Sequence, residues 1–176
     1  PILEWEKHLA MLKGRMDYLN NKNFKKLIYK NSLGTNLEIE LPEGHKWISG
    51  GEKSKSGVEF VANIPTEEIF TMPHRDRVNG TVVSSKPLIY GGSVINHFSL
   101  TFKDGKVVEY SAQTGEEILG KLLDMDEGAR YLGEVALVEY DSPISKSEKV
   151  FYNTLFDENA SCHLALGGAY PTCISG

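Results

Sequence analysis

A hairpin signal near the middle of the chain constrains the fold more than any other feature. Between residues 98 and 102, apolar and polar side chains alternate, which is the period of a half-buried strand (Phe98, Leu100 and Phe102 against Ser99 and Thr101). Lys-Asp-Gly-Lys follows at 103–106, and its Asp-Gly pair is typical of a tight turn between two strands. Since Val-Val-Glu-Tyr-Ser-Ala comes next, we expect an antiparallel β-hairpin within residues 82–112.

Three helices are predicted around this hairpin. Apolar residues at three- and four-residue spacing predict a long helix over residues 2–20. Residues 115–124 group their leucines on one helical face and carry acids in the first turn, where the helix dipole favours them. Residues 158–166 are expected to form a short helix that ends at the Gly167-Gly168 pair.

The remaining elements are strands and loops. Short runs rich in β-branched and aromatic residues predict strands at 25–31, 36–42 and 134–140. Glycine, serine and lysine dominate 42–57, which is the composition of a loop. Strands in consecutive runs, with a long N-terminal helix and a few short helices, predict an α+β fold with mixed, largely antiparallel β-sheets.

Composition excludes several classes of protein. The chain has 176 residues, enough for one domain, and its formal net charge of −5 gives no electrostatic reason to bind nucleic acid. No apolar run reaches the roughly 20 residues that cross a bilayer, and the first residues lack the features of a signal peptide. Cys162 and Cys173 are expected to be free thiols. We therefore expect a soluble, cytoplasmic protein without a nucleic-acid or membrane partner.

Two acidic positions are candidates for chemistry. Glu134 stands before an apolar strand, so its carboxylate needs a cation or hydrogen-bond donors. A salt bridge to Arg130 or to a lysine elsewhere is the alternative to a metal. Glu67 and Glu68 are adjacent in an extended segment, so they point to opposite sides and only one can join a given site. The alternative for this pair is an acidic turn that pairs with the basic residues at 74–77.

Two further candidates lie near the end of the chain. His163 would sit in the expected short helix, as a metal ligand or as a hydrogen-bonded structural residue. Tyr170 follows seven residues later and would share the helical face of His163 if the helix continued through the two glycines. The residue types alone leave both alternatives open.

Four long segments carry a resemblance to a known family. They are Gly34–Gly51, Asn63–Gly80, Leu122–Val138 and Phe151–Pro171. In this order they closely resemble the thermophilic-type metallo-aminopeptidases, the group that includes aminopeptidase T, aminopeptidase S and PepS.

This resemblance implies a site and an activity. It implies that Glu68, Glu134 and His163 are metal ligands, that Tyr170 donates a hydrogen bond to the developing oxyanion, and that either Glu67 or Glu68 could serve as general base. It also implies two divalent ions (Zn, Co or Mg), a metal-activated water, peptide substrates with a free N-terminus and a homodimer.

The resemblance also implies that the chain is part of something larger. Residues 1–176 would be the front part of the metal-binding catalytic domain, without the family's N-terminal domain or the end of the catalytic domain. With three ligands, this stretch alone is expected to hold metal poorly and to be inactive. A different class of function remains the alternative: a non-catalytic, β-rich module for dimerisation or peptide binding.

Overall fold

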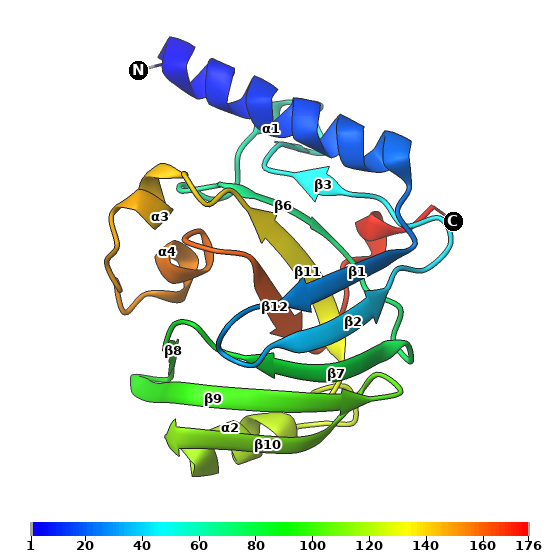
Figure 1. The fold of residues 1–176 in the computed structure, drawn as a ribbon. Helices are drawn as coiled ribbons and strands as arrows, with labels where there is room; N and C mark the ends of the chain where they lie inside the picture. The colour runs from blue at the N-terminus through cyan, green and yellow to red at the C-terminus, as the bar shows by residue number, and fades with distance from the viewer. Residues whose placement is uncertain (1, 176) are drawn as a thin grey trace.

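Two antiparallel sheets and one long helix account for most of the computed structural model, which describes residues 2–175 (Figure 1). The larger sheet has six strands, in the order β1-β2-β7-β9-β10, and β8 pairs with β9. Its strands are β1 (Lys26–Lys30), β2 (Asn36–Glu40), β7 (Val78–Val83), β8 (Leu88–Tyr90), β9 (Ser93–Lys103) and β10 (Lys106–Thr114). The predicted α+β class with largely antiparallel sheets is confirmed.

The second sheet has four strands in the order β12-β11-β6-β3. They are β3 (Ile48–Ser49), β6 (Glu68–Thr71), β11 (Leu132–Val138) and β12 (His163–Leu166). A separate two-stranded ribbon pairs β4 (Glu52–Lys53) with β5 (Glu59–Phe60). The central strand β11 is antiparallel to both of its neighbours, so residues from β6, β11 and β12 can meet on one face of the sheet.

The predicted hairpin is present, since β9 and β10 pair antiparallel. The strands predicted at 25–31 and 36–42 form another antiparallel pair, β1 with β2. Asp104 and Gly105 form the tip of the β9–β10 hairpin with φ angles of 49° and 82°, which is why an Asp-Gly pair suits this turn.

The helices cover the outside of the sheets. They are α1 (Ile2–Lys22), α2 (Glu116–Leu123), α3 (Pro143–Lys146) and α4 (Thr154–Glu158), with a 3-10 turn η1 (Pro171–Cys173). Helix α1 contacts β3 and β6 of the four-stranded sheet, and α2 contacts the β9–β10 hairpin (Figure 1). Within residues 2–175 no helix is long and apolar enough to span a bilayer.

The hydrophobic core connects both sheets with helices α1 and α2. Leu12 from α1, Ile39 from β2, Val135 from β11 and Leu123 from α2 are each at most 1% exposed and belong to one hydrophobic cluster. The predicted helices at 2–20 and 115–124 are therefore confirmed. Each buries an apolar stripe, which is the feature that predicted it.

Two predictions about local structure need correction. The helix expected at 158–166 is wrong: α4 ends at Glu158, and His163–Leu166 is strand β12. Residues 163–166 pair with the edge of β11, and this hydrogen bonding between strands overrides the helical preference of the residues. The loop expected at 42–57 also contains the two-residue strands β3 and β4.

Candidate metal centre

Three adjacent strands bring Glu68, Glu134 and His163 together. In the register of the sheet, His163 lies opposite Ala136, and Glu68 lies opposite Val138. Ala136 is two residues from Glu134 in one direction and two from Val138 in the other, so all these side chains share one face. The imidazole of His163 therefore stands between the two glutamates, each of which reaches toward it.

The three ligand atoms converge closely. His163 Nε2 is 2.9 Å from Glu68 Oε2 and 3.7 Å from Glu134 Oε1. One ligand atom from each residue lies within 4.8 Å of the others, and the three side chains are between 16% and 19% exposed. Two carboxylates and an imidazole are a ligand set that suits divalent transition metals.

The protonation of His163 fits a metal ligand. Ser161 O lies 3.1 Å from Nδ1 and can only accept, so Nδ1 carries the hydrogen and donates it. In the neutral ring, Nε2 then presents its lone pair to the centre, as a metal ligand must. Glu68 Oε2 is buried and has no assigned hydrogen bond among residues 2–175, although His163 Nε2 lies 2.9 Å away. Facing acceptors of this kind are satisfied by a cation placed between them.

The electrostatics of the site favour a cation as well. Burial, and then the nearby Glu68 carboxylate, raise the pKa of Glu134. Burial lowers the pKa of His163, but the Glu68 carboxylate, the Ser161 carbonyl and Glu158 together outweigh burial, so the pKa is raised overall. Two acids held close together in a half-buried place repel each other, and a bound divalent ion would remove this repulsion.

A glycine in β11 sets the position of Glu134. The pairing of β11 with β12 shifts register between Leu132 and Glu134, and Gly133 lies at this shift. A Cβ at Gly133 would overlap Gly168 O and lie 2.6 Å from Gly167 O. The close approach of the Gly167-Gly168 backbone therefore requires glycine here, and it places Glu134 opposite Ala165.

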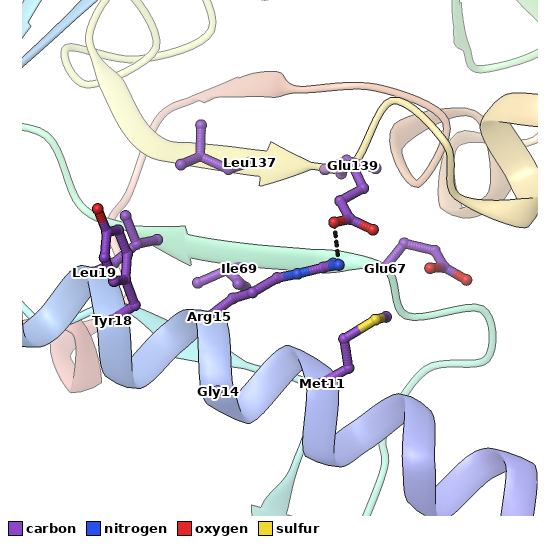
Figure 2. A pocket seen from close by; sticks show the side chains of 10 residues that line it. Met11, Gly14, Arg15, Tyr18, Leu19, Glu67, Ile69, Leu137 and Glu139 are labelled. Carbon is purple, nitrogen blue, oxygen red and sulfur yellow. Dashed lines mark ion pairs between the residues drawn. The ribbon is translucent and has the colours of Figure 1, made fainter.

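The two neighbouring acids point to opposite faces of the sheet, as expected from their positions. Glu67 faces α1, where its Oε2 is 3.7 Å from His8 Nε2. It also lines a cavity of about 430 Å³ between α1 and the sheet, together with Met11, Arg15, Leu19, Ile69, Leu137 and Glu139 (Figure 2). Arg15 forms an ion pair with Glu139 across this cavity (Figure 2). Of the two acids, only Glu68 lies on the face of the metal centre.

The competing salt bridges are not formed by the candidate ligands. Arg130 pairs with Asp124 at 2.7 Å instead of with Glu134. Arg77 pairs with Glu40 at 3.0 Å. The cation that Glu134 needs is therefore not supplied by Arg130.

Tyr170 lies close to the same face but not by the expected route. Because His163 is in a strand, the two residues do not share a helical face, and that part of the prediction is wrong. The ring of Tyr170 packs on Phe70 with centroids 5.8 Å apart, and Phe70 alternates with Ile69 onto the face of Glu68. Tyr170 is 60% exposed. Its catalytic role stays a prediction.

Two residues that were not predicted as site residues from the sequence also belong to this region. Glu158, the last residue of α4, is half-buried, and burial raises its pKa while His163 and Glu68 act on it electrostatically. Asn159 is 2% exposed and accepts a hydrogen bond from Glu67 N. The only sequence signal for them is their position, five and four residues before His163. This position indicates a place in the site only when His163 is known to begin strand β12.

This chain is similar to several known proteins. Aminopeptidase 2 of Geobacillus stearothermophilus is 59% identical over 174 residues, which is 99% of this chain and 42% of that protein. Aminopeptidase AmpS of Bacillus subtilis (strain 168) is 52% identical over 176 residues, which is 100% of this chain and 43% of that protein. The solved structure of wild-type AmpT from Thermus thermophilus has a TM-score of 0.95 and 48% identity, covering 100% of this chain and 44% of that one.

These matches fix the family and the extent of the likeness. The chain spans less than half the length of the curated relatives it matches. A family profile described as thermophilic metalloprotease (M29) matches residues 1–176. The chain therefore belongs to the thermophilic metalloprotease (M29) family.

Proposed function

We propose that this chain is part of a metal-dependent aminopeptidase that removes N-terminal residues from peptides. The observation that carries the proposal is the convergence of Glu68, Glu134 and His163 within 4.8 Å in a chain whose relatives are named aminopeptidases. Residues 1–176 would form the front part of the metal-binding catalytic domain. Nothing in residues 2–175 favours the alternative of a non-catalytic module.

The side chains of this chain would hold the metal in distinct ways. His163 Nε2 is directed by the hydrogen bond from Nδ1 to Ser161, and so gives a fixed direction of approach. Glu68 and Glu134 each have a second carboxylate oxygen, which could contact a second ion, so the set is compatible with two divalent ions. When bound, such ions polarise a carbonyl and lower the pKa of water.

Glu68 has two possible roles in this proposal, metal ligand and general base. Glu67 lies on the α1 side of the sheet, so of this pair only Glu68 could act on a substrate at the centre. Its Oε2 is buried against His163, and this position suits a ligand better than a group that exchanges protons with solvent. We therefore assign Glu68 as a ligand and look for the general base outside the Glu67-Glu68 pair.

Chelation tests the dependence on metal directly. In the complete protein that carries this chain, we expect a chelator to abolish release of the first residue from a peptide with a free N-terminus. Refilling with Co²⁺ or Zn²⁺ should restore it, and an N-acetylated peptide of the same sequence should stay intact throughout. Full activity in protein shown to be free of metal would contradict the proposal.

Tyr170→Phe tests the proposed oxyanion donor. The variant keeps the ring that packs on Phe70 and loses only the hydroxyl, so we expect a normal fold, unchanged metal content and a kcat lower by about 10²–10³. Tyr140→Phe is a matched control, because Tyr140 is 94% exposed. Equal kcat in the Tyr170 variant and the wild type would remove Tyr170 from the mechanism.

The assembly and the identity of the ion are proposals from the resemblance, and the location is a proposal from the composition. We propose a homodimer that acts in the cytoplasm, with zinc, cobalt or magnesium as the ion. Light scattering on the purified complete protein measures the assembly, metal analysis of protein from cells identifies the ion, and cell fractionation measures the location.

A further inference from the structure

One peptide group next to the metal centre is held at both ends by side chains from distant elements. The carbonyl of Thr66 and the N–H of Glu67 belong to the same peptide group. His8 Nε2 lies 2.7 Å from Thr66 O, and because a carbonyl only accepts, the imidazole donates. Asn159 Oδ1 accepts from Glu67 N at 2.7 Å.

The two side chains that bind this peptide group, those of Asn159 and His8, are restrained by burial, and Asn159 also by a second hydrogen bond. Asn159 is 2% exposed, and its Nδ2 donates to Leu155 O at 2.8 Å, so both ends of the amide are used. His8 comes from α1, and its side chain is 17% exposed. Thr66 is itself 5% exposed. Glu67 precedes β6, so its N–H lies outside the strand and takes Asn159 as its partner.

This peptide group immediately precedes one candidate ligand, Glu68, and Asn159 connects it to the segment that leads to another, His163. Glu68 follows it directly, and its own carbonyl accepts from Ser49 Oγ at 3.1 Å. Asn159 stands four residues before His163, with buried Ala160 between them. A shift of this peptide would therefore change the separation of Glu68 Oε2 and His163 Nε2, which is now 2.9 Å.

We propose that Asn159 and His8 are positioning residues of the metal centre, which set the geometry of Glu68 relative to His163 by clamping the Thr66–Glu67 peptide. This inference rests on the proposed metal site and adds to it. Neither side chain touches the ion; each acts through the backbone that carries Glu68. Partners of metal ligands that lie outside the coordination sphere typically change metal affinity by roughly 10–100-fold.

The test measures cobalt binding in the complete protein, by titration of the metal-free protein with Co²⁺ and by the visible absorption of the bound ion. Asn159→Leu keeps the approximate volume and removes both hydrogen bonds, so we expect the dissociation constant to rise roughly 10–100-fold and the absorption bands to shift. Asn159→Asp keeps an oxygen that accepts from Glu67 N and should recover part of the affinity.

A second pair of variants serves if the buried position 159 tolerates no change. His8→Leu removes the donor to Thr66 O, whereas His8→Gln keeps a donor near the Nε2 position. We expect weaker binding and altered bands for leucine, and near wild-type values for glutamine. Leu119→Ala in α2 controls for lost stability, because Leu119 is buried and its helix packs against the β9–β10 hairpin. It should lower the unfolding temperature without changing the cobalt spectrum.

The outcomes separate the clamp from the metal site itself. Wild-type affinity and bands in folded Asn159→Leu and His8→Leu would overturn the clamp while the metal site stands. An equal loss of affinity in Leu119→Ala would also overturn it, since general instability would then explain the effect. If His163→Ala binds cobalt as the wild type does, the metal site fails, and with it the need for a clamp.

Discussion

Glu134→Gln is expected to weaken Zn²⁺ or Co²⁺ binding by the complete protein by more than about 100-fold, beyond the range of outer partners. The amide has nearly the shape of the carboxylate but lacks its charge. Glu134 Oε1 is 3.7 Å from His163 Nε2 and shares a half-buried face with Glu68, so its charge acts on the ion with little screening.

The same variant should have the opposite effect on the metal-free protein. Burial and the Glu68 carboxylate raise the pKa of Glu134, which means that its charged form is unfavourable in the folded chain without metal. Removing the charge should therefore leave the unfolding temperature of the metal-free protein unchanged or higher. Loss of function with no loss of stability is typical of a functional site.

Glu109→Gln provides the matched control for this experiment. Glu109 is an exposed residue of β10, outside the four-stranded sheet, and its replacement makes the same chemical change. Metal affinity and unfolding temperature should both match the wild type. If Glu134→Gln binds metal as tightly as Glu109→Gln, then Glu134 is not a ligand.

Of the substitutions proposed for this chain, Gly105→Ala should lower the free energy of unfolding most, by about 3 kcal/mol or more. Gly105 has a φ of 82°, which costs an L-residue energy. In addition, an alanine Cβ would overlap Arg75 O and lie 2.7 Å from Arg75 C. The turn between β9 and β10 would have to move away from the segment before β7.

Gly57→Ala separates the two contributions. Gly57 has a similar φ of 84°, but an added Cβ there meets no atom within 4 Å. It should therefore lose only the conformational part, about 1 kcal/mol. Denaturant unfolding of both variants measures the difference, and equal losses would show that the contact with Arg75 has no effect.

The sequence predicts the parts of this fold that depend on neighbours in the chain. The alternation at 98–102 and the Asp-Gly turn are local signals, and the hairpin they predict is present. The apolar stripe of residues 2–20 likewise predicts α1, since its spacing matches the helical period. The contact of Gly105 with Arg75, thirty positions earlier, has no local signal at all.

The metal centre shows where local reasoning fails. Residues 158–166 favour a helix by composition, but the open edge of β11 takes His163–Leu166 as a strand. The register that puts His163 midway between Glu68 and Glu134 depends on this pairing and on the backbone approach at Gly133. The residues alone left Glu134 between a salt bridge and a metal, and only the family resemblance named the three ligands.

Anomalous X-ray scattering from zinc in crystals of the complete protein tests the central claim most directly. A peak is expected on the face of the four-stranded sheet shared by β6, β11 and β12, about 2.0–2.2 Å from a carboxylate oxygen of Glu68, one of Glu134 and His163 Nε2. The assignment would be contradicted if the zinc peak lay elsewhere, or if no anomalous peak appeared beside these three groups at saturating zinc.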